Sequence, residues 1–272
     1  MLQVSLARLK QGHRTMPFPK QEPQLPDRFR GLPVVDTSKC PEGCQSCADA
    51  CPTDAIIVDK PDGMPKGIRI DLGRCLFCTD CQEACSQGAI NYSQDYRLAT
   101  RTREDLVLST FGTSKVFETS EVLRLAYALE AKSRHLFGRS LKLRQVSAGG
   151  CNACEADLNV LNTVVFDLSR FGIQFVASPR HADGIVVTGA VSNNMRAALL
   201  ETYSAIPSPK LVIAVGACAI SGGPYLDNPE IQNGCGSSLP VDLYIPGCPP
   251  HPLTILDGLL RLLGRLGGTA EK

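Results

Sequence analysis

Cysteine is the residue through which this chain could do chemistry, and most of its 13 cysteines fall into two short runs. The second run has the spacing C-x2-C-x2-C-x3-C and comprises Cys75, Cys78, Cys81 and Cys85. The first run has the spacing C-x3-C-x2-C-x3-C-P and comprises Cys40, Cys44, Cys47 and Cys51. A tight loop of this kind turns three thiolates toward one face of a 4Fe-4S cluster. The two runs therefore predict bound iron-sulfur clusters.

The spacing also predicts which cysteines share a cluster, because the fourth cysteine of such a run ligates the other cluster of a two-cluster module. We assign one cluster to Cys75, Cys78, Cys81 and Cys51, and the other to Cys40, Cys44, Cys47 and Cys85. Two departures from the usual pattern are the longer first interval of the first run and Ser86, which stands where a proline is usual. A pair of four-cysteine zinc sites is the alternative, although zinc usually takes separated C-x2-C pairs.

Four more cysteines lie far apart in the sequence but in similar places, directly after apolar runs that we expect to be strands. They are Cys151, Cys154, Cys218 and Cys248. Loops beyond the carboxyl ends of parallel strands converge, so these four thiolates can meet around one further cluster. Glycines beside them let the backbone approach bulky sulfide; they are Gly149, Gly150, Gly216, Gly222, Gly223 and Gly247. Taken alone, Cys218 is also typical of a buried apolar position, and Cys151 with Cys154 of a redox dithiol.

Three residues near these motifs have weaker signals. Cys235 is left over, and we interpret it as a loop thiol without a role in preference to a redox sensor. Glu155 could relay protons or contact a partner, or be a solvated or helix-N-terminal carboxylate. His251 could bond a cluster sulfur, although an interface or surface imidazole is the more usual role.

The sequence divides into four parts. Residues 1–39 are predicted to form an extended, proline-rich arm, and residues 40–92 a two-cluster 4Fe-4S domain with an internal repeat. Residues 93–140 are predicted to be a linker with an amphipathic helix over 121–137, and residues 141–272 a second domain.

The second domain alternates apolar runs with helical windows, which indicates a parallel sheet covered on both faces. Strands are predicted at Lys142–Ser147, Ile173–Ser178, Gly184–Thr188, Leu211–Val215 and Asp242–Ile245. Helices are predicted at Asn152–Phe171, Asn194–Ile206 and Pro252–Leu266. The expected fold is thus an α+β ferredoxin-like module followed by a doubly wound, flavodoxin-like α/β domain.

Composition excludes several functions. An odd cysteine count in a chain of 272 residues argues against a disulfide framework and for metal ligation in a reducing compartment. A net charge of +1 gives no support to nucleic-acid binding. No G-x-G-x-x-G motif follows a predicted strand, and the sequence has no G-x4-G-K-[ST] motif. We therefore expect no flavin, nicotinamide or nucleotide site. Residues 1–10 lack a signal pattern, and no apolar stretch is long enough to span a bilayer.

The motifs resemble known families. Residues 40–92 resemble the two-cluster ferredoxin subunits of complex I and of formate hydrogenlyase. GGCNACE, VGACAISGG and PVDLYIPGCPPHP resemble the small subunit of NiFe-hydrogenases and the 20 kDa-type subunit of complex I. The C-x2-C spacing of Cys151 and Cys154 is similar to that of the hydrogenases, since the complex I subunit has adjacent cysteines. The resemblance implies that Cys151, Cys154, Cys218 and Cys248 hold a proximal 4Fe-4S cluster.

By this resemblance, the chain is expected to be an electron-transfer subunit of an oxidoreductase of the formate hydrogenlyase type, with three 4Fe-4S clusters in series. The catalytic nickel is expected in a large partner subunit, so no catalytic residue is assigned here. Other expected partners are further redox subunits or ferredoxin and integral membrane subunits, which would hold the chain at the cytoplasmic face of the membrane. Two alternatives stay open: a complex I-like subunit that passes electrons to quinone, and a metal-stabilised regulatory or scaffold protein.

Overall fold

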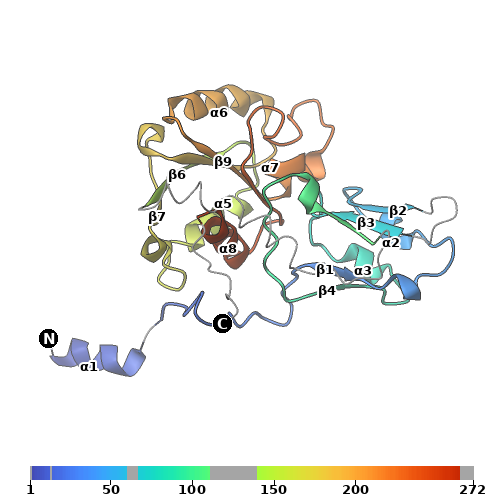
Figure 1. The fold of residues 1–272 in the computed structure, drawn as a ribbon, viewed down its shortest axis with the longest axis horizontal. Helices are drawn as coiled ribbons and strands as arrows, with labels where there is room; N and C mark the ends of the chain where they lie inside the picture. Colours follow the sequence, from blue (N-terminus) through green and yellow to red (C-terminus); the bar gives the residue numbers. More distant parts are fainter. Residues whose placement is uncertain (1, 13, 60–66, 111–139, 264–272) are drawn as a thin grey trace, which may run out of the picture.

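The computed structural model describes residues 2–12, 14–59, 67–110 and 140–263. The predicted helix over 121–137 lies outside the described residues, as does the end of the predicted helix Pro252–Leu266. A larger α/β body and a smaller module of short strands lie side by side, and the N-terminal arm runs along both (Figure 1).

The smaller module repeats one unit, a short helix followed by a strand. The first copy has α2 (Ser46–Asp49) and β2 (Ile56–Asp59), and the second has α3 (Asp80–Glu83) and β4 (Ile90–Tyr92). Each of these strands pairs antiparallel with the strand that precedes the other copy's cysteine run: β2 with β3 (Gly67–Asp71) and β4 with β1 (Pro33–Val35). The internal repeat in the sequence is therefore a structural repeat.

One short ladder and one isolated bridge connect residues 93–110 to both halves of the molecule. Strand β5 (Val107–Ser109) pairs antiparallel with β3 and gives the small module a three-stranded sheet. Thr100 forms an isolated antiparallel bridge with Tyr244 of the α/β body. This part of the predicted linker is thus hydrogen-bonded to two sheets.

The predicted parallel sheet is confirmed, with five strands in the order β10-β9-β8-β6-β7. The strands are β6 (Leu141–Ser147), β7 (Ile173–Phe175), β8 (Gly184–Thr188), β9 (Leu211–Val215) and β10 (Leu243–Ile245). Renumbered along the chain this order is 2-1-3-4-5, the flavodoxin-like arrangement. Every residue of the central strands β8 and β9 is buried, as expected for apolar runs covered on both faces.

Helices cover the sheet, and one of them is shorter than predicted. They are α5 (Ala153–Val160), α6 (Asn193–Ala205), α7 (Ala217–Ser221) and α8 (Pro252–Leu262). The helix predicted over Asn152–Phe171 was too long, because α5 ends before Asn162–Thr163–Val164–Val165. Asparagine and β-branched residues have low helix propensity. Single 3-10 turns occupy Thr37–Lys39, Glu104–Leu106, Leu168–Phe171, Pro179–His181 and Gly223–Tyr225.

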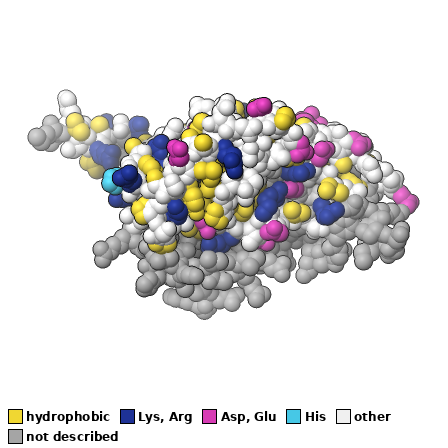
Figure 2. Space-filling model, turned by 90° about the horizontal axis from the view of Figure 1, so that it is seen from above, with side chains coloured by type: hydrophobic (Ala, Val, Ile, Leu, Met, Phe, Trp, Pro, Cys, Tyr) yellow, Lys and Arg dark blue, Asp and Glu magenta, His cyan; other side chains and the backbone are white. Residues whose placement is uncertain are grey.

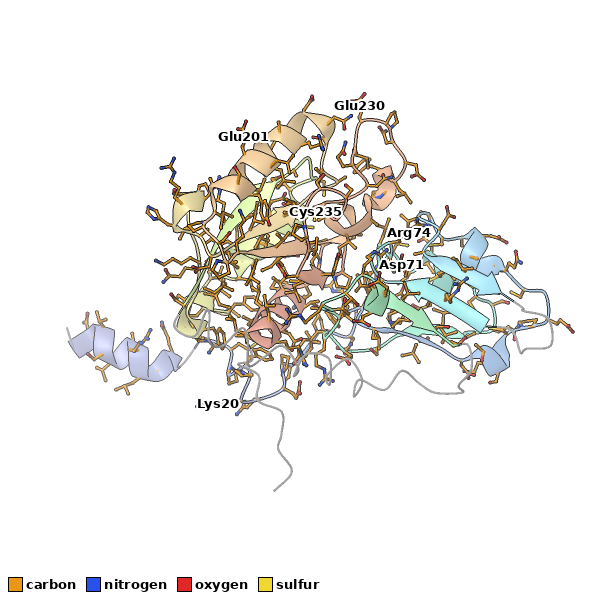
Figure 3. All side chains as sticks on the ribbon, turned by 45° about the horizontal axis from the view of Figure 1, so that its top comes forward. Lys20, Asp71, Arg74, Glu201, Glu230 and Cys235 are labelled. Carbon is orange, nitrogen blue, oxygen red and sulfur yellow. The ribbon has the colours of Figure 1, made fainter. Side chains whose placement is uncertain are left out.

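One hydrophobic core continues from the small module into the α/β body. It includes Ile68 and Leu72 of the module together with Ile220 and Val212 of the body. Gly73 makes this contact close, since a Cβ on it would lie 2.8 Å from Ile220 Cγ2. Figure 3 shows Asp71 and Arg74 on the side of the module that meets the body. The two halves therefore pack as one unit.

The arm is held by backbone hydrogen bonds and leaves its first helix uncovered. Met16 N donates to Val165 O, and Gly31 N donates to Ser93 O. Helix α1 (Leu2–Gln11) projects from the body (Figure 1), and Leu9 is 80% exposed.

Among the described residues, no helix has the length and apolarity needed to cross a membrane. Basic and acidic side chains are interspersed on the face shown in Figure 2.

Candidate functional site

The first cysteine quartet lines a small hollow beside α2. Its members are Cys40, Cys44, Cys47 and Cys85, the set assigned from the spacing. Ile68, Ala89 and Ile90 form the apolar part of the same wall. The backbone N of Ala89 donates to Cys85 Sγ at 3.3 Å. Burial, and then the nearby Cys40 thiol, raise the pKa of Cys47 to about 11.

The second quartet lines a separate hollow beside α3. Its members are Cys51, Cys75, Cys78 and Cys81, again the set assigned from the spacing. Ala55 N donates to Cys51 Sγ at 3.2 Å, and Phe77 N donates to Cys75 Sγ at 3.4 Å. Burial raises the pKa of Cys75 to about 12. The exchange of Cys51 and Cys85 between the two runs is therefore visible directly in the geometry.

The loop between Cys75 and Cys81 is wound tightly. Phe77 and Thr79 have φ values of 53° and 80°, in the left-handed region that non-glycine residues rarely adopt. Arg30 of the arm holds this loop, because its Nη1 donates to Phe77 O at 2.6 Å. No sequence pattern predicted this contact, which joins residues 47 positions apart.

The third quartet is assembled from loops at the carboxyl ends of β6, β9 and β10. Cys151 follows β6, Cys154 lies in the first turn of α5, Cys218 lies in α7 after β9, and Cys248 follows β10. Burial raises the pKa of Cys154, and Glu155, Cys218, Cys248 and Cys151 each add to the rise. A Cβ on Gly216, two residues before Cys218, would lie 2.5 Å from Cys154 Sγ and 3.5 Å from Gly247 O, so the loops that carry these cysteines converge. They meet next to the point where strand order reverses, between β6 and β8.

Two glycines leave room at the third quartet that a side chain would fill. A Cβ on Gly216, whose φ is +89°, would lie 2.5 Å from Cys154 Sγ. A Cβ on Gly223 would lie 2.8 Å from Cys218 Sγ. Both belong to the glycines that the sequence singled out.

The donor sets fit 4Fe-4S clusters. Four soft thiol ligands stand around each of the first two hollows, and backbone N–H groups are directed at the sulfurs. In the described part of the chain, no three Cys, His, Asp or Glu side chains converge as they would around a single metal ion. Interleaved four-cysteine runs are typical of 4Fe-4S modules, whereas zinc usually takes separated C-x2-C pairs.

The quartets are adjacent in a fixed order. Helix α2, which carries Cys47 of the first quartet, packs against α3, which carries Cys81 of the second. Cys78 of the second quartet and Cys248 of the third line one cavity. The second quartet therefore lies between the other two.

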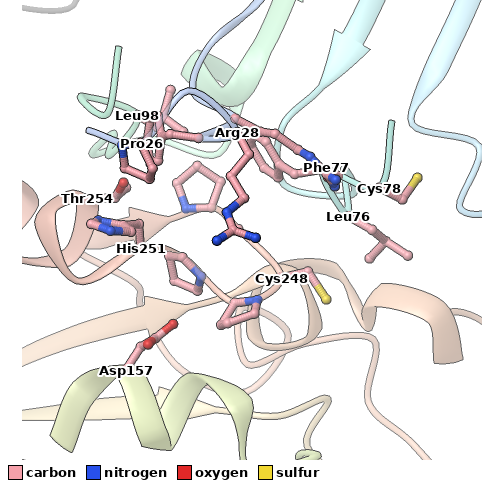
Figure 4. A pocket seen from close by; sticks show the side chains of 16 residues that line it. Pro26, Arg28, Leu76, Phe77, Cys78, Leu98, Asp157, Cys248, His251 and Thr254 are labelled. Carbon is pink, nitrogen blue, oxygen red and sulfur yellow. The ribbon is translucent and has the colours of Figure 1, made fainter. Parts of the chain in front are cut away.

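A cavity of about 600 Å³ separates the second and third quartets. Cys78 and Cys248 both border it, and the guanidinium of Arg28 points into it (Figure 4). Phe29 and Arg30 of the arm and Pro246–His251 complete much of its wall. The arm, predicted only as an extended segment, thus contributes to the space between two cysteine quartets.

The three residues with weaker signals have defined places. Glu155 is 6% exposed and accepts a hydrogen bond from Thr188 Oγ1 at 2.6 Å, so a solvated carboxylate was the wrong expectation and a helix-N-terminal one fits. Burial alone would raise its pKa, but hydrogen bonds from Ser147 and Thr188 outweigh this and lower it. His251 caps α8, since its Nδ1 accepts from Leu253 N at 3.1 Å, a role that the sequence analysis missed.

Cys235 lies in a loop, as expected, but its side chain is completely buried in the core of the α/β body (Figure 3). Its backbone N donates to Ala219 O at 2.9 Å, which draws the loop against α7. Burial raises the pKa of this thiol to about 12. It lines neither of the two hollows nor the cavity described above.

Comparison with protein-family models gives two matches. Residues 39–89 match a 4Fe-4S dicluster domain, and residues 151–262 match the family described as NADH ubiquinone oxidoreductase, 20 Kd subunit. The match to the 4Fe-4S dicluster domain supports iron-sulfur clusters in the small module.

Three curated proteins illustrate the range of relatives. The chain is 44% identical over 128 residues to formate hydrogenlyase subunit 7 of Escherichia coli, covering 47% of this chain and 50% of that protein. It is 40% identical over 129 residues to the probable membrane-bound hydrogenase subunit mbhJ of Pyrococcus furiosus, covering 47% and 77%. It is 42% identical over 175 residues to a subunit of the NADH-quinone oxidoreductase of Clostridium beijerinckii, covering 64% and 90%. The first match spans only half of that relative's length.

Proposed function

The chain belongs to the family of the 20 kDa subunit of NADH–ubiquinone oxidoreductase, and from this premise we propose that it is an electron-transfer subunit of a membrane-associated NiFe-hydrogenase complex of the formate hydrogenlyase type. Its twelve quartet cysteines would hold three 4Fe-4S clusters. When bound, such clusters supply one-electron carriers whose potentials depend on burial and on hydrogen bonds to sulfur.

The observation that carries this proposal is the serial order of the quartets. The helices that carry Cys47 and Cys81 pack against each other, and Cys78 and Cys248 line the same cavity, so each quartet is next to the following one. The continuous core across the two halves fixes these approaches. Metals that only stabilise the fold would not need to lie next to one another, whereas clusters that pass electrons along a chain must.

The chain's own residues would set the conditions for transfer. Backbone N–H groups of Ala55, Phe77 and Ala89 donate to ligand sulfurs and favour the thiolate form. Burial of Cys47 and Cys75 keeps water away from the ligands inside the module. Because both modules are part of one chain, the electron needs no diffusional encounter between them.

The third quartet is the end that would face the catalytic partner. Cys151 and Cys248 are exposed, in contrast to the buried Cys47, Cys75 and Cys81. A partner subunit that covers them would complete the shielding of the proximal cluster. We infer a NiFe-hydrogenase-type large subunit there, ferredoxin or another redox subunit at the other end, and membrane subunits that hold the complex at the cytoplasmic face.

A second candidate function is electron delivery to quinone. It is favoured by the 42% identity to the NADH-quinone oxidoreductase subunit of Clostridium beijerinckii, of which the match covers 90%. Nickel analysis of the complex purified through a tag on this chain separates the two functions. We expect nickel in a partner subunit and hydrogen-dependent reduction of a viologen dye; a nickel-free complex that reduces quinone would support the second candidate.

The cluster assignment is tested with Cys248→Ala in the full chain, purified without oxygen. We expect the variant to lose about a third of its iron and one of three EPR signals, because the other two quartets do not use Cys248. Cys235→Ala is the matched control, since this cysteine belongs to no quartet, and it should keep all iron. Unchanged iron in Cys248→Ala would contradict the third site.

A further inference from the structure

Tyr92 places a hydroxyl group at the second quartet. It is the last residue of β4, it lines the hollow formed by Cys51, Cys75, Cys78 and Cys81, and its Oη lies 3.5 Å from Cys81 Sγ. The internal repeat does not explain this contact. Ala55 and Ala89 are four residues after Cys51 and Cys85 and make equivalent N–H contacts to sulfur. By the same offset, the counterpart of Tyr92 in the first copy is Val58, which has no hydroxyl.

The first quartet has a hydroxyl contact of a different kind. Ser46 Oγ lies 3.5 Å from Cys44 Sγ, but this pair is exposed, so water competes for the same sulfur. The Tyr92–Cys81 pair is partly buried, and Cys81 itself is only 6% exposed. A hydrogen bond to sulfur therefore has a larger effect at the second quartet than at the first.

Tyr92 is held in place on two sides. Its backbone is paired with Pro33 through the β1–β4 ladder, which uses the arm. Its ring lies 6.2 Å, centroid to centroid, from that of Phe77, in the loop that carries Cys75 and Cys78. A phenol fixed in this way keeps its hydroxyl directed at the same sulfur.

The direction of the hydrogen bond follows from the chemistry of the ligand. A cysteine bound to iron is a thiolate and has no proton to donate, so the contact can only be Tyr92 O–H donating to Cys81 Sγ. A donor at a ligand sulfur stabilises the added negative charge of the reduced cluster. It therefore makes reduction more favourable.

We propose that the Tyr92 hydroxyl raises the reduction potential of the cluster held by Cys51, Cys75, Cys78 and Cys81, a role that rests on the proposed function. Tyr92 acts through ligand sulfurs of this quartet, with the printed contact to Cys81, so it is a positioning residue and not a catalytic one. Because this quartet lies between the other two, the hydroxyl sets the potential of the middle cluster in the relay.

The test is an EPR-monitored redox titration of the full chain with all clusters loaded, comparing wild type with Tyr92→Phe. We expect one midpoint potential to shift to a more negative value while the other two stay unchanged. Tyr96→Phe is the matched control, because Tyr96 also donates through its hydroxyl, to Glu22 at 3.3 Å, but lines neither of the two cysteine hollows. It should leave all three potentials unchanged.

Replacement of Tyr92 by 3-fluorotyrosine keeps the ring and makes the hydroxyl a stronger donor, so at neutral pH the same midpoint should move to a more positive value. Opposite shifts in the two variants support the proposal, and this second variant remains informative if Tyr92→Phe loses iron. Absence of any shift with full iron content, or equal shifts in Tyr96→Phe, would overturn it. Wild-type protein that binds no iron-sulfur clusters would instead overturn the proposed function.

Discussion

Each of the three quartets consists of four cysteines, but the small module and the α/β body bring their cysteines together in different ways. In the small module, three ligands of each quartet come from one loop, and a repeated short helix and strand fix the fourth. In the α/β body, ligands come from the ends of three strands, and their approach depends on sheet order and on Gly216. The first arrangement is encoded locally, whereas the second depends on the whole domain.

Gly216→Ala is the change with the largest expected effect, because it disturbs only the third quartet, whose geometry depends on the whole α/β body. The new Cβ would lie 2.5 Å from Cys154 Sγ, at a φ of +89° that alanine rarely adopts. We expect loss of the third cluster, seen as a fall of about a third in iron content, with the two other EPR signals kept.

Gly88→Ala is its matched control. Gly88 also has a positive φ, +59°, and lies close to Cys85, but a Cβ there would have no atom within 4 Å. This variant should cost about 1 kcal/mol of unfolding free energy and lose no iron. Equal iron loss in both variants would show that backbone strain, and not the space beside Cys154, controls the third quartet.

Arg103→Met tests whether the two regions unfold separately. Arg103 donates to both carboxylate oxygens of Asp71, from Nη1 at 2.8 Å and from Nη2 at 2.5 Å. We expect a loss of about 1.5 kcal/mol, reduced by partial exposure of the pair, in one cooperative transition of the cluster-loaded protein. Lys39→Met, which removes an exposed ion pair with Asp36, should leave the unfolding free energy unchanged within error. Two separate transitions in chemical denaturation would contradict the inference that the two halves unfold as one unit.

Ser221→Ala weakens the contact between the regions without removing a charge. Ser221 Oγ is 2.9 Å from Gly73 O and 3.1 Å from Ala217 O, so it joins α7, which carries Cys218, to the turn before Cys75. We expect a loss of about 1 kcal/mol with all iron retained. Ser237→Ala, in an exposed loop, is the control and should have no measurable effect. A loss of iron would mean that this contact also positions ligands.

Cys235 gives the smallest effect and a pH dependence. Its pKa is raised by burial from 9.0 to about 12, so the folded state holds the proton more tightly than the unfolded state. The resulting stability is fully present below pH 9 and is lost as the pH rises from there toward 12. From neutral pH to pH 9.5, wild type should lose about 1 kcal/mol more than Cys235→Ala in denaturant titrations. Parallel pH curves would contradict the buried, protonated thiol.

Local patterns were sufficient for part of the molecule. The pairing of Cys51 and Cys85 with the opposite runs, and the bounds of β8 and β9, follow from spacing and from continuous apolar runs, and the structure places them accordingly. These features depend on neighbours only a few residues away.

Contacts distant in sequence were the part that could not be predicted. The hydrogen bond from Arg30 to Phe77 and the placement of Tyr92 at Cys81 depend on how the arm pairs with β4. The role of His251 as the cap of α8 had a local signal. His251 directly precedes Pro252, and proline is common at the first helical position, directly after the cap. The burial of Cys235 had none, because it results from packing against α7.

The two strand pairings of residues 93–110, with β3 and with Tyr244, have a consequence for the design of expression clones. A fragment that ends at residue 92 lacks β5, and one that starts at residue 141 lacks the Thr100 partner of Tyr244. Each would expose an unpaired sheet edge and the apolar surface around Gly73 or Ile220, which favours aggregation. Half-molecules cut at the boundaries of the sequence motifs are therefore poor starting points, and the full chain is the unit to produce.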